Sequence, residues 1–282
     1  MNKATIAGIV TFNPDISRLK KNIEAIIYQV KAVLIVDNNS SNLQEIESLS
    51  NSKIIIIRNN NNKGIAFALN QILDWADKKG YEWVITLDQD SVCPPDYIST
   101  AQPYMKAKIG QIVPILFESN SKTYHYLGDK SNGNAVQCVS KSITSASITN
   151  VKVWKKIGGF DNDLFIDYVD YDYAIRLRLA GYKILRLNNV FLDHQIGHSV
   201  NHKVGFINVR VANHSAFRKY YICRNIVIFI RRYKLKAKPI AEVLRLFKVI
   251  SFSVLFEDKK KDKIKSIFNG IKDGLAYNIK KD

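Results

Sequence analysis

The sequence predicts an α/β protein with a mostly parallel, doubly wound sheet, followed by a basic helical extension. Three observations lead to this prediction. Short apolar runs alternate with amphipathic stretches through the first half of the chain. Polar side chains rich in oxygen acceptors follow three of the apolar runs, and the last third of the chain is strongly basic. Such alternation is typical of βαβ units, in which helices join parallel strands.

Each element follows from its local pattern. Strands are expected at 4–11, 32–37, 53–58, 82–88, 111–116, 143–150 and 183–188. Helices are expected at 15–29, 42–50, 64–79, 95–107, 151–157 and 170–180. In the third helix, Ile65, Leu69 and Ile72 recur at helical spacing and form one apolar face. Residues 117–140 are expected to form a loop, and the chain after 205 is expected to be helical.

Length and charge limit the organisation of the chain. Its 282 residues favour one α/β domain with an extension. Residues 201–282 contain 20 Lys and Arg against 6 Asp and Glu, a net charge of +14, whereas residues 1–200 carry only +3. A basic tail implies an anionic partner, which could be nucleic acid, an anionic membrane surface or a phosphorylated lipid.

Cysteine spacing and hydropathy indicate the compartment. The three cysteines are far apart and form no CxxC motif, which favours reduced thiols in a cytosolic protein. No signal peptide is recognised at the start of the sequence, and no stretch has the 18 or so apolar residues of a spanning helix.

Leu87-Asp88-Gln89-Asp90 closes the apolar run that begins at Trp83. In an extended segment, residues i and i+2 point the same way, so both carboxylates can face one ligand. Two like charges at a strand end favour a cation between them, and Mg²⁺ or Mn²⁺ suits carboxylate oxygens. The alternative is a solvated turn that happens to carry two acids.

Two further strand ends are polar. The first strand leads into Thr11 and Asn13, and the second leads into Asp37 and Asn39. Ligands of doubly wound sheets bind at the carboxyl ends of strands, so these side chains predict a polar cleft there. Ordinary turns or helix caps use the same residue types and are the alternative.

A second acidic cluster contains Asp167, Asp170 and Asp172, followed by Arg176. Asp172 and Arg176 are four residues apart and can pair on one face of a helix. Asp170, at the start of that helix, is a candidate general base for deprotonating a hydroxyl. His194 follows the strand expected at 183–188 and is a candidate third metal ligand, although a lone histidine is more often structural.

The order and spacing of these motifs resemble glycosyltransferase family 2, and within it the bacterial rhamnosyltransferases. The resemblance covers roughly residues 4–230. Its most specific phrases are Thr86-Leu87-Asp88-Gln89-Asp90-Ser91, Phe165-Ile166-Asp167-Tyr168-Val169-Asp170 and Tyr220-Tyr221-Ile222-Cys223-Arg224-Asn225. Its other matching elements are Asn62-Lys63-Gly64, Gly158-Gly159-Phe160-Asp161 and Asp193-His194.

The resemblance implies a GT-A fold with a nucleotide-binding half at 1–116, an acceptor-binding half at 117–205 and a basic helical region at 206–282. It also implies roles on the donor side. Thr11 and Asn13 would border the nucleotide base, and Asp37, with Asn39 beside it, would bind the base or ribose. Asn62 and Lys63 would lie near the nucleotide, with Lys63 as a phosphate or base contact.

The resemblance further assigns the metal and the catalytic base. Asp88-Gln89-Asp90 matches the DXD motif, in which Asp90 would ligate Mg²⁺ or Mn²⁺ and Asp88 would contact the ribose or the metal. His194 matches a metal-ligating histidine found in some members. Asp170 matches the catalytic base, with Asp167 and Arg176 in the same block. The chain departs from the family at Val169, where Glu is usual, and at Ser145-Ala146-Ser147, where a Gly is common.

The implied activity is that of an inverting glycosyltransferase in bacterial surface polysaccharide synthesis. L-rhamnose would pass from dTDP-rhamnose to a hydroxyl of a glycan, carried on polyprenyl diphosphate. UDP-galactofuranose or a UDP-hexose remains open as the donor. A basic nucleic-acid-binding protein is an alternative of another class, which the acidic cleft disfavours because unneutralised carboxylates repel phosphates.

The basic tail predicts a membrane contact. One face at 264–275 is apolar and lysines occupy the others, a pattern typical of helices that lie on anionic membranes. The apolar residues are Ile264, Ile267, Phe268, Ile271 and Leu275, and the upstream Leu244, Phe247, Ile250 and Leu255 could extend this apolar surface. The expected location is therefore the inner face of the cell membrane. Packing on the catalytic domain, or a homodimer interface, is the alternative.

Overall fold

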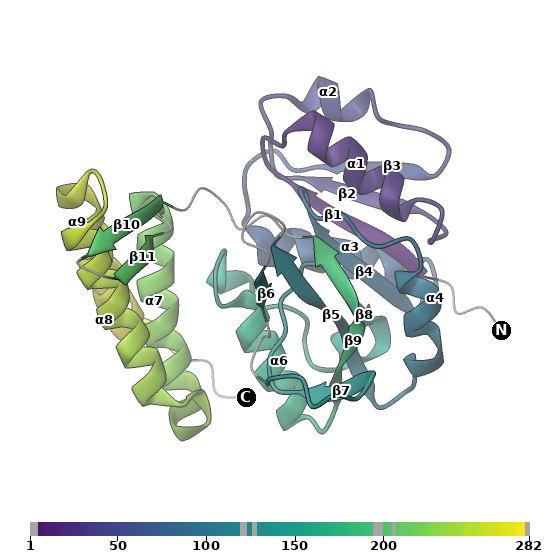
Figure 1. The fold of residues 1–282 in the computed structure, drawn as a ribbon. Helices are drawn as coiled ribbons and strands as arrows, with labels where there is room; N and C mark the ends of the chain where they lie inside the picture. Colours follow the sequence, from purple (N-terminus) through teal and green to yellow (C-terminus); the bar gives the residue numbers. More distant parts are fainter. Residues whose placement is uncertain are drawn as a thin grey trace. The chain divides into compact units, whose positions relative to one another are not determined.

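The computed structural model describes residues 5–118, 123–125, 129–193, 200–204, 207–211 and 213–279. The chain divides into two compact units. The first, here called the sheet unit, comprises Met1–Asp163 and Val169–Gln195. The second, the helical unit, comprises Leu164–Tyr168 and Ile196–Asp282 (Figure 1). In the described ranges, no helix combines the length and the apolar character needed to cross a membrane.

The sheet unit contains a mixed sheet in the order β3-β2-β1-β4-β8-β5-β9-β7, with β6 paired to β5. Four pairs are parallel, namely β3-β2, β2-β1, β1-β4 and β5-β9, while β8 runs antiparallel to both of its neighbours. The predicted fold class is therefore confirmed. The strands are β1 (Thr5–Thr11), β2 (Val33–Asp37), β3 (Ile54–Arg58), β4 (Trp83–Asp88), β5 (Ile109–Glu118), β6 (Thr123–His125), β7 (Val136–Val139), β8 (Ser147–Asn150) and β9 (Lys183–Asp193).

Short helices connect these strands. They are α1 (Ile16–Ile26), α2 (Leu43–Glu47), α3 (Ile65–Lys78), α4 (Tyr97–Ala101), α5 (Val151–Lys156) and α6 (Val169–Leu179), with 3₁₀ turns at Gln102–Tyr104 and Asn162–Leu164. Asp15 caps α1 because its side chain accepts a hydrogen bond from the Arg18 amide at 2.8 Å. Every residue of β2 is buried, as expected for a parallel strand covered on both faces.

Close packing of α3 on β1 depends on Gly8. A Cβ atom at this position would lie 2.2 Å from Cγ2 of Ile72, so only glycine leaves room for the helix. Gly64, with a φ of 84°, precedes the first residue of α3. These two glycines fix where α3 lies and where it starts.

Two segments differ from the sequence predictions. The expected loop at 117–140 contains β6 and β7, which pair with β5 and β9. The region expected to be helical after 205 contains β11 (Ile207–Val211), which pairs antiparallel with β10 (Val200–Val204). Apolar and polar residues alternate along β11, and this period of two is the sequence signal for a strand.

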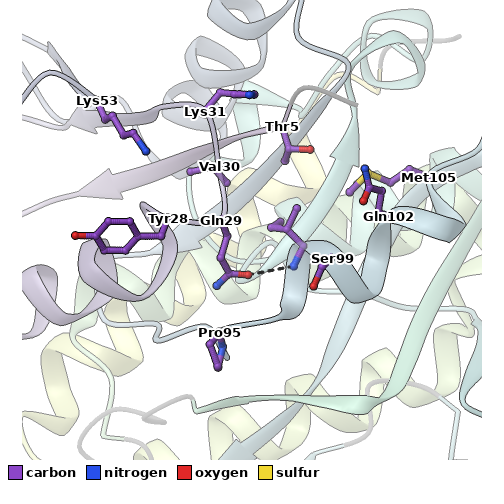
Figure 2. A pocket seen from close by; sticks show the side chains of 11 residues that line it. Thr5, Tyr28, Gln29, Val30, Lys31, Lys53, Pro95, Ser99, Gln102 and Met105 are labelled. Atoms are coloured by element: carbon purple, nitrogen blue, oxygen red, sulfur yellow. Dashed lines mark hydrogen bonds between the residues drawn. The ribbon is translucent and has the colours of Figure 1, made fainter. Parts of the chain in front are cut away.

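The sheet unit has a cavity of about 630 Å³ at the edge where β1 begins (Figure 2). Thr5, Tyr28, Lys31 and Lys53 are among its lining residues. Gln29 and Ile98 also line the cavity, and the Gln29 side-chain oxygen accepts a hydrogen bond from the Ile98 amide at 3.2 Å. None of the residues predicted to bind nucleotide, metal or acceptor lines this cavity.

In the helical unit, α7 (Ala216–Tyr233), α8 (Pro239–Leu255) and α9 (Lys260–Ala276) lie side by side (Figure 1). Two glycines of α9 allow it to approach α7 closely. A Cβ atom at Gly270 would lie 2.3 Å from the Tyr220 carbonyl oxygen, and one at Gly274 would lie 2.7 Å from that of Arg224. The α9 face that contains these glycines is therefore covered by α7.

A buried ion cluster also links these helices. Lys219 on α7 and Lys263 on α9 both donate to Glu257, at 2.6 Å and 2.9 Å. All three side chains are almost fully buried, so the pairing offsets a large desolvation cost. Lys263 also donates to the side-chain oxygen of Asn213 at 2.6 Å.

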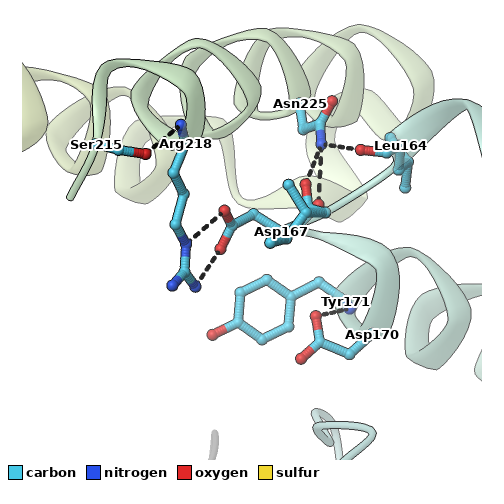
Figure 3. Close-up of polar contacts among 8 residues, drawn as sticks. Leu164, Asp167, Asp170, Tyr171, Ser215, Arg218 and Asn225 are labelled. Atoms are coloured by element: carbon cyan, nitrogen blue, oxygen red, sulfur yellow. Dashed lines mark hydrogen bonds and ion pairs between the residues drawn. The ribbon is translucent and has the colours of Figure 1, made fainter. Parts of the chain in front are cut away.

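The segment Leu164–Tyr168 is held by α7 (Figure 3). Phe165, Asp167 and Tyr168 have φ values of 61°, 61° and 66°, a conformation that costs free energy for residues other than glycine. The buried Asn225 side-chain amide donates to the carbonyl oxygens of Leu164, Ile166 and Asp167 at 2.8, 2.8 and 2.9 Å. Arg218 contacts both carboxylate oxygens of Asp167 at 3.0 Å. These contacts stabilise the strained segment.

We expect Asn225→Asp to loosen this segment. A carboxylate cannot donate, so the three carbonyl groups lose their partner and face a buried negative charge. The expected loss is about 2 kcal/mol, or roughly thirtyfold faster amide exchange if the segment opens locally. Hydrogen exchange followed by mass spectrometry, on peptides that cover residues 164–168, measures this change.

Arg231→Ala is the matched control. Arg231 also lies on α7 and donates to two carbonyl oxygens, those of Gly274 at 2.8 Å and Tyr277 at 2.7 Å, but it does not contact the strained segment. Equal acceleration in both variants, or unchanged exchange in Asn225→Asp, would contradict the assignment.

Candidate functional site

Three of the predicted strand ends lie side by side at the carboxyl edge of the sheet. Thr11 is the register partner of Asp37, and Val10 is the partner of Asp88. This arrangement is the one that parallel pairing predicts from the sequence. The edge therefore collects hydroxyl, carboxylate and amide groups from segments far apart in the chain.

The carboxylate of Asp37 connects two of the polar segments at this edge. It is fully buried, and its Oδ1 accepts hydrogen bonds from the hydroxyls of Thr11 at 2.8 Å and Ser40 at 2.5 Å. Its Oδ2 accepts a bond from the Ser40 amide at 2.8 Å. Both oxygens are thus engaged inside the protein, and the carboxylate joins the end of β1 to the turn after β2.

Asn13 and Asn39 form the exposed rim above this network. Both are exposed and have positive φ values of 47° and 70°, which asparagine tolerates better than most residues. The Asn13 side-chain oxygen accepts a bond from the Ser41 amide at 2.7 Å, and its own amide donates to the Ser40 hydroxyl at 2.8 Å. The two predicted base-binding turns are therefore joined to each other.

Asn62 and Lys63 lie in the turn between β3 and α3. The Asn62 side-chain oxygen accepts a bond from the Gly64 amide at 2.9 Å and shapes the start of α3. The Lys63 side chain is exposed, and its ammonium group lies 4.5 Å from the centre of the Phe67 ring. This places a mobile positive charge beside a helix N-terminus, a combination that favours anions.

The loop after β4 is held by its main chain and by Gln89. The side-chain amide of Asn22 donates to the Asp88 carbonyl oxygen at 2.7 Å, and Arg18 Nε donates to that of Asp90 at 2.7 Å. The side-chain oxygen of Gln89 accepts a bond from the Phe12 amide at 2.9 Å. Among the described residues, the Asp90 carboxylate makes no hydrogen bond or ion pair. The anchors thus fix the loop and leave this acid for a ligand.

The end of β9 lies beside the same loop. Asp193 forms an antiparallel bridge with Val92, and its carboxylate lies 3.8 Å from an Arg18 guanidinium nitrogen. His194, the next residue and a predicted metal ligand, lies outside the described residues. Within the part of the chain that the structure describes, no group of three or more His, Cys, Asp or Glu side chains forms a metal site.

The residues that are present nevertheless fit a hard cation. Asp88 and Asp90 supply carboxylate oxygens at a partly exposed strand end, and such ligands suit Mg²⁺ or Mn²⁺ completed by water and phosphate oxygens. The carboxylate of Asp90 is not consumed by an internal partner in the described ranges, unlike that of Asp37.

Asp170 lies in the first turn of α6 and is partly exposed, and its Oδ1 accepts a bond from the Tyr171 amide at 3.0 Å. Leu177, near the other end of α6, lies against Gly110 at the start of β5, where a Cβ atom would be 2.4 Å away. Because β8 runs antiparallel to both β4 and β5, β5 runs in the same direction as β4, and its first residues lie at the amino edge of the sheet. The contact with Gly110 therefore places Leu177 at that edge, and Asp170 lies seven residues before it, about two turns of α6 away.

The other two residues of the predicted catalytic block make structural contacts. Arg176 Nε lies 2.8 Å from the nearly buried carboxylate of Asp172, so the ion pair predicted from their spacing is confirmed. Arg176 also donates to the Ile157 carbonyl oxygen at 2.9 Å and ties α6 to the end of α5. In the helical unit, both oxygens of Asp167 contact Arg218.

Sequence reasoning missed three residues of this site. Arg18 and Asn22 are four residues apart on α1, and Asn22 is fully buried among the apolar residues of that helix. A buried asparagine in an apolar stripe was the available signal, because such a group needs a partner. Phe12, with 46% of its surface exposed, follows Thr11 at the strand end and offers an aromatic face to a ligand.

Known proteins resemble this chain in sequence and in fold. The dTDP-rhamnosyl transferase RfbF of Shigella flexneri is 29% identical over 248 residues, which cover 82% of this chain and 81% of that protein. TarS of S. aureus (residues 1–349), in a crystal structure with UDP-GlcNAc, has a TM-score of 0.61 at 14% identity. That match covers 96% of this chain and 80% of TarS 1–349. A second crystal structure of TarS 1–349 gives a TM-score of 0.56 at 12% identity, covering 95% of this chain and 81% of the other.

The sequence profile described as glycosyl transferase family 2 matches residues 7–172. This range is more than half of the chain and includes the strand ends at Thr11, Asp37 and Asp88 as well as Asp170. The chain belongs to glycosyl transferase family 2.

Proposed function

We propose that this glycosyltransferase moves L-rhamnose from dTDP-rhamnose to a hydroxyl group of a glycan, with inversion at the anomeric carbon. One observation carries the proposal: the carboxylate of Asp90, two residues after the end of β4, makes no hydrogen bond or ion pair within the described ranges, and it lies at the sheet edge where the family 2 motifs meet. Similarity to a dTDP-rhamnosyl transferase over 82% of the chain supports rhamnose as the sugar.

On the donor side, the chain has to hold a nucleoside diphosphate. The exposed ring of Phe12 offers a stacking surface for the base, and Lys63 offers a positive charge to the diphosphate. Asp88 and Asp90, with His194 as a further ligand, would hold Mg²⁺ or Mn²⁺. When bound, the ion supplies Lewis-acid neutralisation of the negative charge on the diphosphate leaving group.

On the acceptor side, the chain has to remove a proton from the attacking hydroxyl. We assign this role to Asp170, which lies at the partly exposed start of α6. Its carboxylate would accept the proton as the hydroxyl oxygen forms the new glycosidic bond. A single displacement of this kind, without a covalent sugar–enzyme intermediate, inverts the anomeric configuration.

The acceptor we propose is a glycan carried on polyprenyl diphosphate, at the inner face of the cell membrane. The support is chemical: a strongly basic tail in the last third of the chain matches an anionic lipid surface. The membrane location is separate from the sugar transfer itself, which needs only the sheet edge and Asp170.

A donor panel tests the identity of the sugar. The protein is heated with dTDP-rhamnose, UDP-galactofuranose or UDP-glucose in the presence of Mn²⁺. A ligand at one hundred times its dissociation constant stabilises the folded state by about 2.7 kcal/mol, so dTDP-rhamnose should give the largest rise in melting temperature. A larger rise with either UDP-sugar would replace rhamnose by that sugar and leave the family assignment intact.

Replacement of Asp170 by Asn tests the general base. The amide keeps the size of the side chain but cannot take the proton, so turnover should fall by about 10²–10⁴-fold while donor-induced stabilisation stays the same. Asp163→Asn is the control, since Asp163 is an exposed acid from the same region of the chain and should retain activity. Near-normal turnover in Asp170→Asn would exclude this residue as the base.

A further inference from the structure

Helix α8 buries two polar side chains and exposes several large apolar ones. Glu242 and Ser253 are its fully buried residues, while Leu246 and Val249 are partly buried. Glu242 accepts a hydrogen bond from the Tyr168 hydroxyl, and Ser253 donates to the Val249 carbonyl oxygen at 2.8 Å. Ile240, Leu244 and Phe247, by contrast, are 78, 63 and 62% exposed. A surface helix in contact with water normally presents charged and polar residues on its exposed side, whereas α8 presents these large apolar ones.

The exposed apolar residues share one face of α8. Ile240, Val243, Leu244 and Phe247 recur at intervals of three and four, and Val254 follows Phe247 after seven residues, which is two helical turns. We call this face the α8 stripe, and it consists of Ile240, Val243, Leu244, Phe247, Val254 and Leu255. Leu235, 87% exposed, adds an apolar side chain just before the helix. A helix of 17 residues is about 25 Å long, which makes this a large apolar surface.

Exposed lysines bracket the α8 stripe at both ends. One group directly precedes the helix and consists of Lys234, Lys236 and Lys238. The other begins four residues after the end of the helix, at the start of α9, and consists of Lys259, Lys260 and Lys261. A surface that is apolar in the middle and cationic at both ends matches the interface of an anionic bilayer, which has acyl chains beneath negative headgroups.

We propose that α8 lies in the plane of an anionic membrane surface, with the α8 stripe among the acyl chains and both lysine groups at the headgroups. A second copy of the chain fits this surface poorly. Because both ends are positive, two α8 helices would bring lysine groups together in a parallel or an antiparallel pair. The proposal identifies the part of the protein that would contact the membrane. It rests on the membrane location in the proposed function and does not depend on which sugar is transferred.

This assignment places the main membrane contact on α8, which the sequence predicts only as an extension of the apolar face at 264–275 on α9. Ile267 of α9 is buried, and Gly270 and Gly274 pack against α7. The exposed apolar side chains that remain on α9 are Phe268 and Leu275, seven residues apart. The two helices can therefore be compared directly, since each offers two large exposed apolar side chains for substitution.

Vesicle flotation of the full-length protein tests the proposal. Vesicles of phosphatidylcholine with about a quarter phosphatidylglycerol should carry the protein, and pure phosphatidylcholine should carry at least about tenfold less. The double variant Leu244→Ser with Phe247→Ser should lower the bound fraction on anionic vesicles by more than about tenfold. The control pair, Phe268→Ser with Leu275→Ser, should float like the parent protein.

Folding and sugar transfer are measured alongside. Circular dichroism checks that each variant is folded, and transfer to a soluble acceptor without vesicles should be equal in all of them. Absence of sugar transfer by the parent protein would count against the proposed function. The flotation result would still show whether α8 binds the membrane. Parent protein that stays in solution, or an α8 variant that floats normally, would overturn the membrane proposal. So would a parent dimer in light scattering that the α8 substitutions convert to a monomer, because a second copy would then cover the stripe.

Discussion

The candidate site depends on how the loop after β4 is anchored. Asn22 and Arg18 of α1 hold the carbonyl oxygens of Asp88 and Asp90, and Gln89 holds the Phe12 amide at the end of β1. Because these contacts use main-chain atoms and the Gln89 side chain, the loop is fixed without engaging the Asp90 carboxylate. Two acids held near each other at a strand end attract a cation, and a diphosphate can share it. If the proposed donor site is correct, this anchoring links the packing of α1 to donor binding.

Much of the sheet unit could be predicted from the sequence because its signals are local. Buried strands such as β2 are continuous apolar runs, and parallel pairing places Thr11, Asp37 and Asp88 at one edge. The pair of Asp172 and Arg176 follows from helical spacing. The internal bonding of Asp37 could not be predicted, since its partner Thr11 is 26 residues away and only the strand register brings the two together. The buried Asp37 therefore joins the end of β1 to the turn after β2.

The helical unit was less predictable because neighbouring helices decide whether an apolar helix face is buried or exposed. The pattern at 264–275 was correctly recognised as amphipathic, but α7 covers the part of that face around Gly270 and Gly274. The sequence around 240–255 gives no sign that Glu242 and Ser253 turn inward. Likewise, Asn225 belongs to a motif recognised from the sequence, but only the structure places its amide on three carbonyl groups of a strained segment.

Measuring manganese binding tests directly whether the loop after β4 forms a metal site. The full-length protein is titrated with Mn²⁺ in the presence of dTDP, and the free ion is followed by electron paramagnetic resonance. We expect dTDP-dependent binding of Mn²⁺ that Asp90→Asn weakens by at least about tenfold, because a charged ligand is lost. Asp96→Asn, an exposed acid six residues further along the chain, should bind like the parent protein. Equal Mn²⁺ affinity in Asp90→Asn and the parent protein would contradict a metal site at the end of β4.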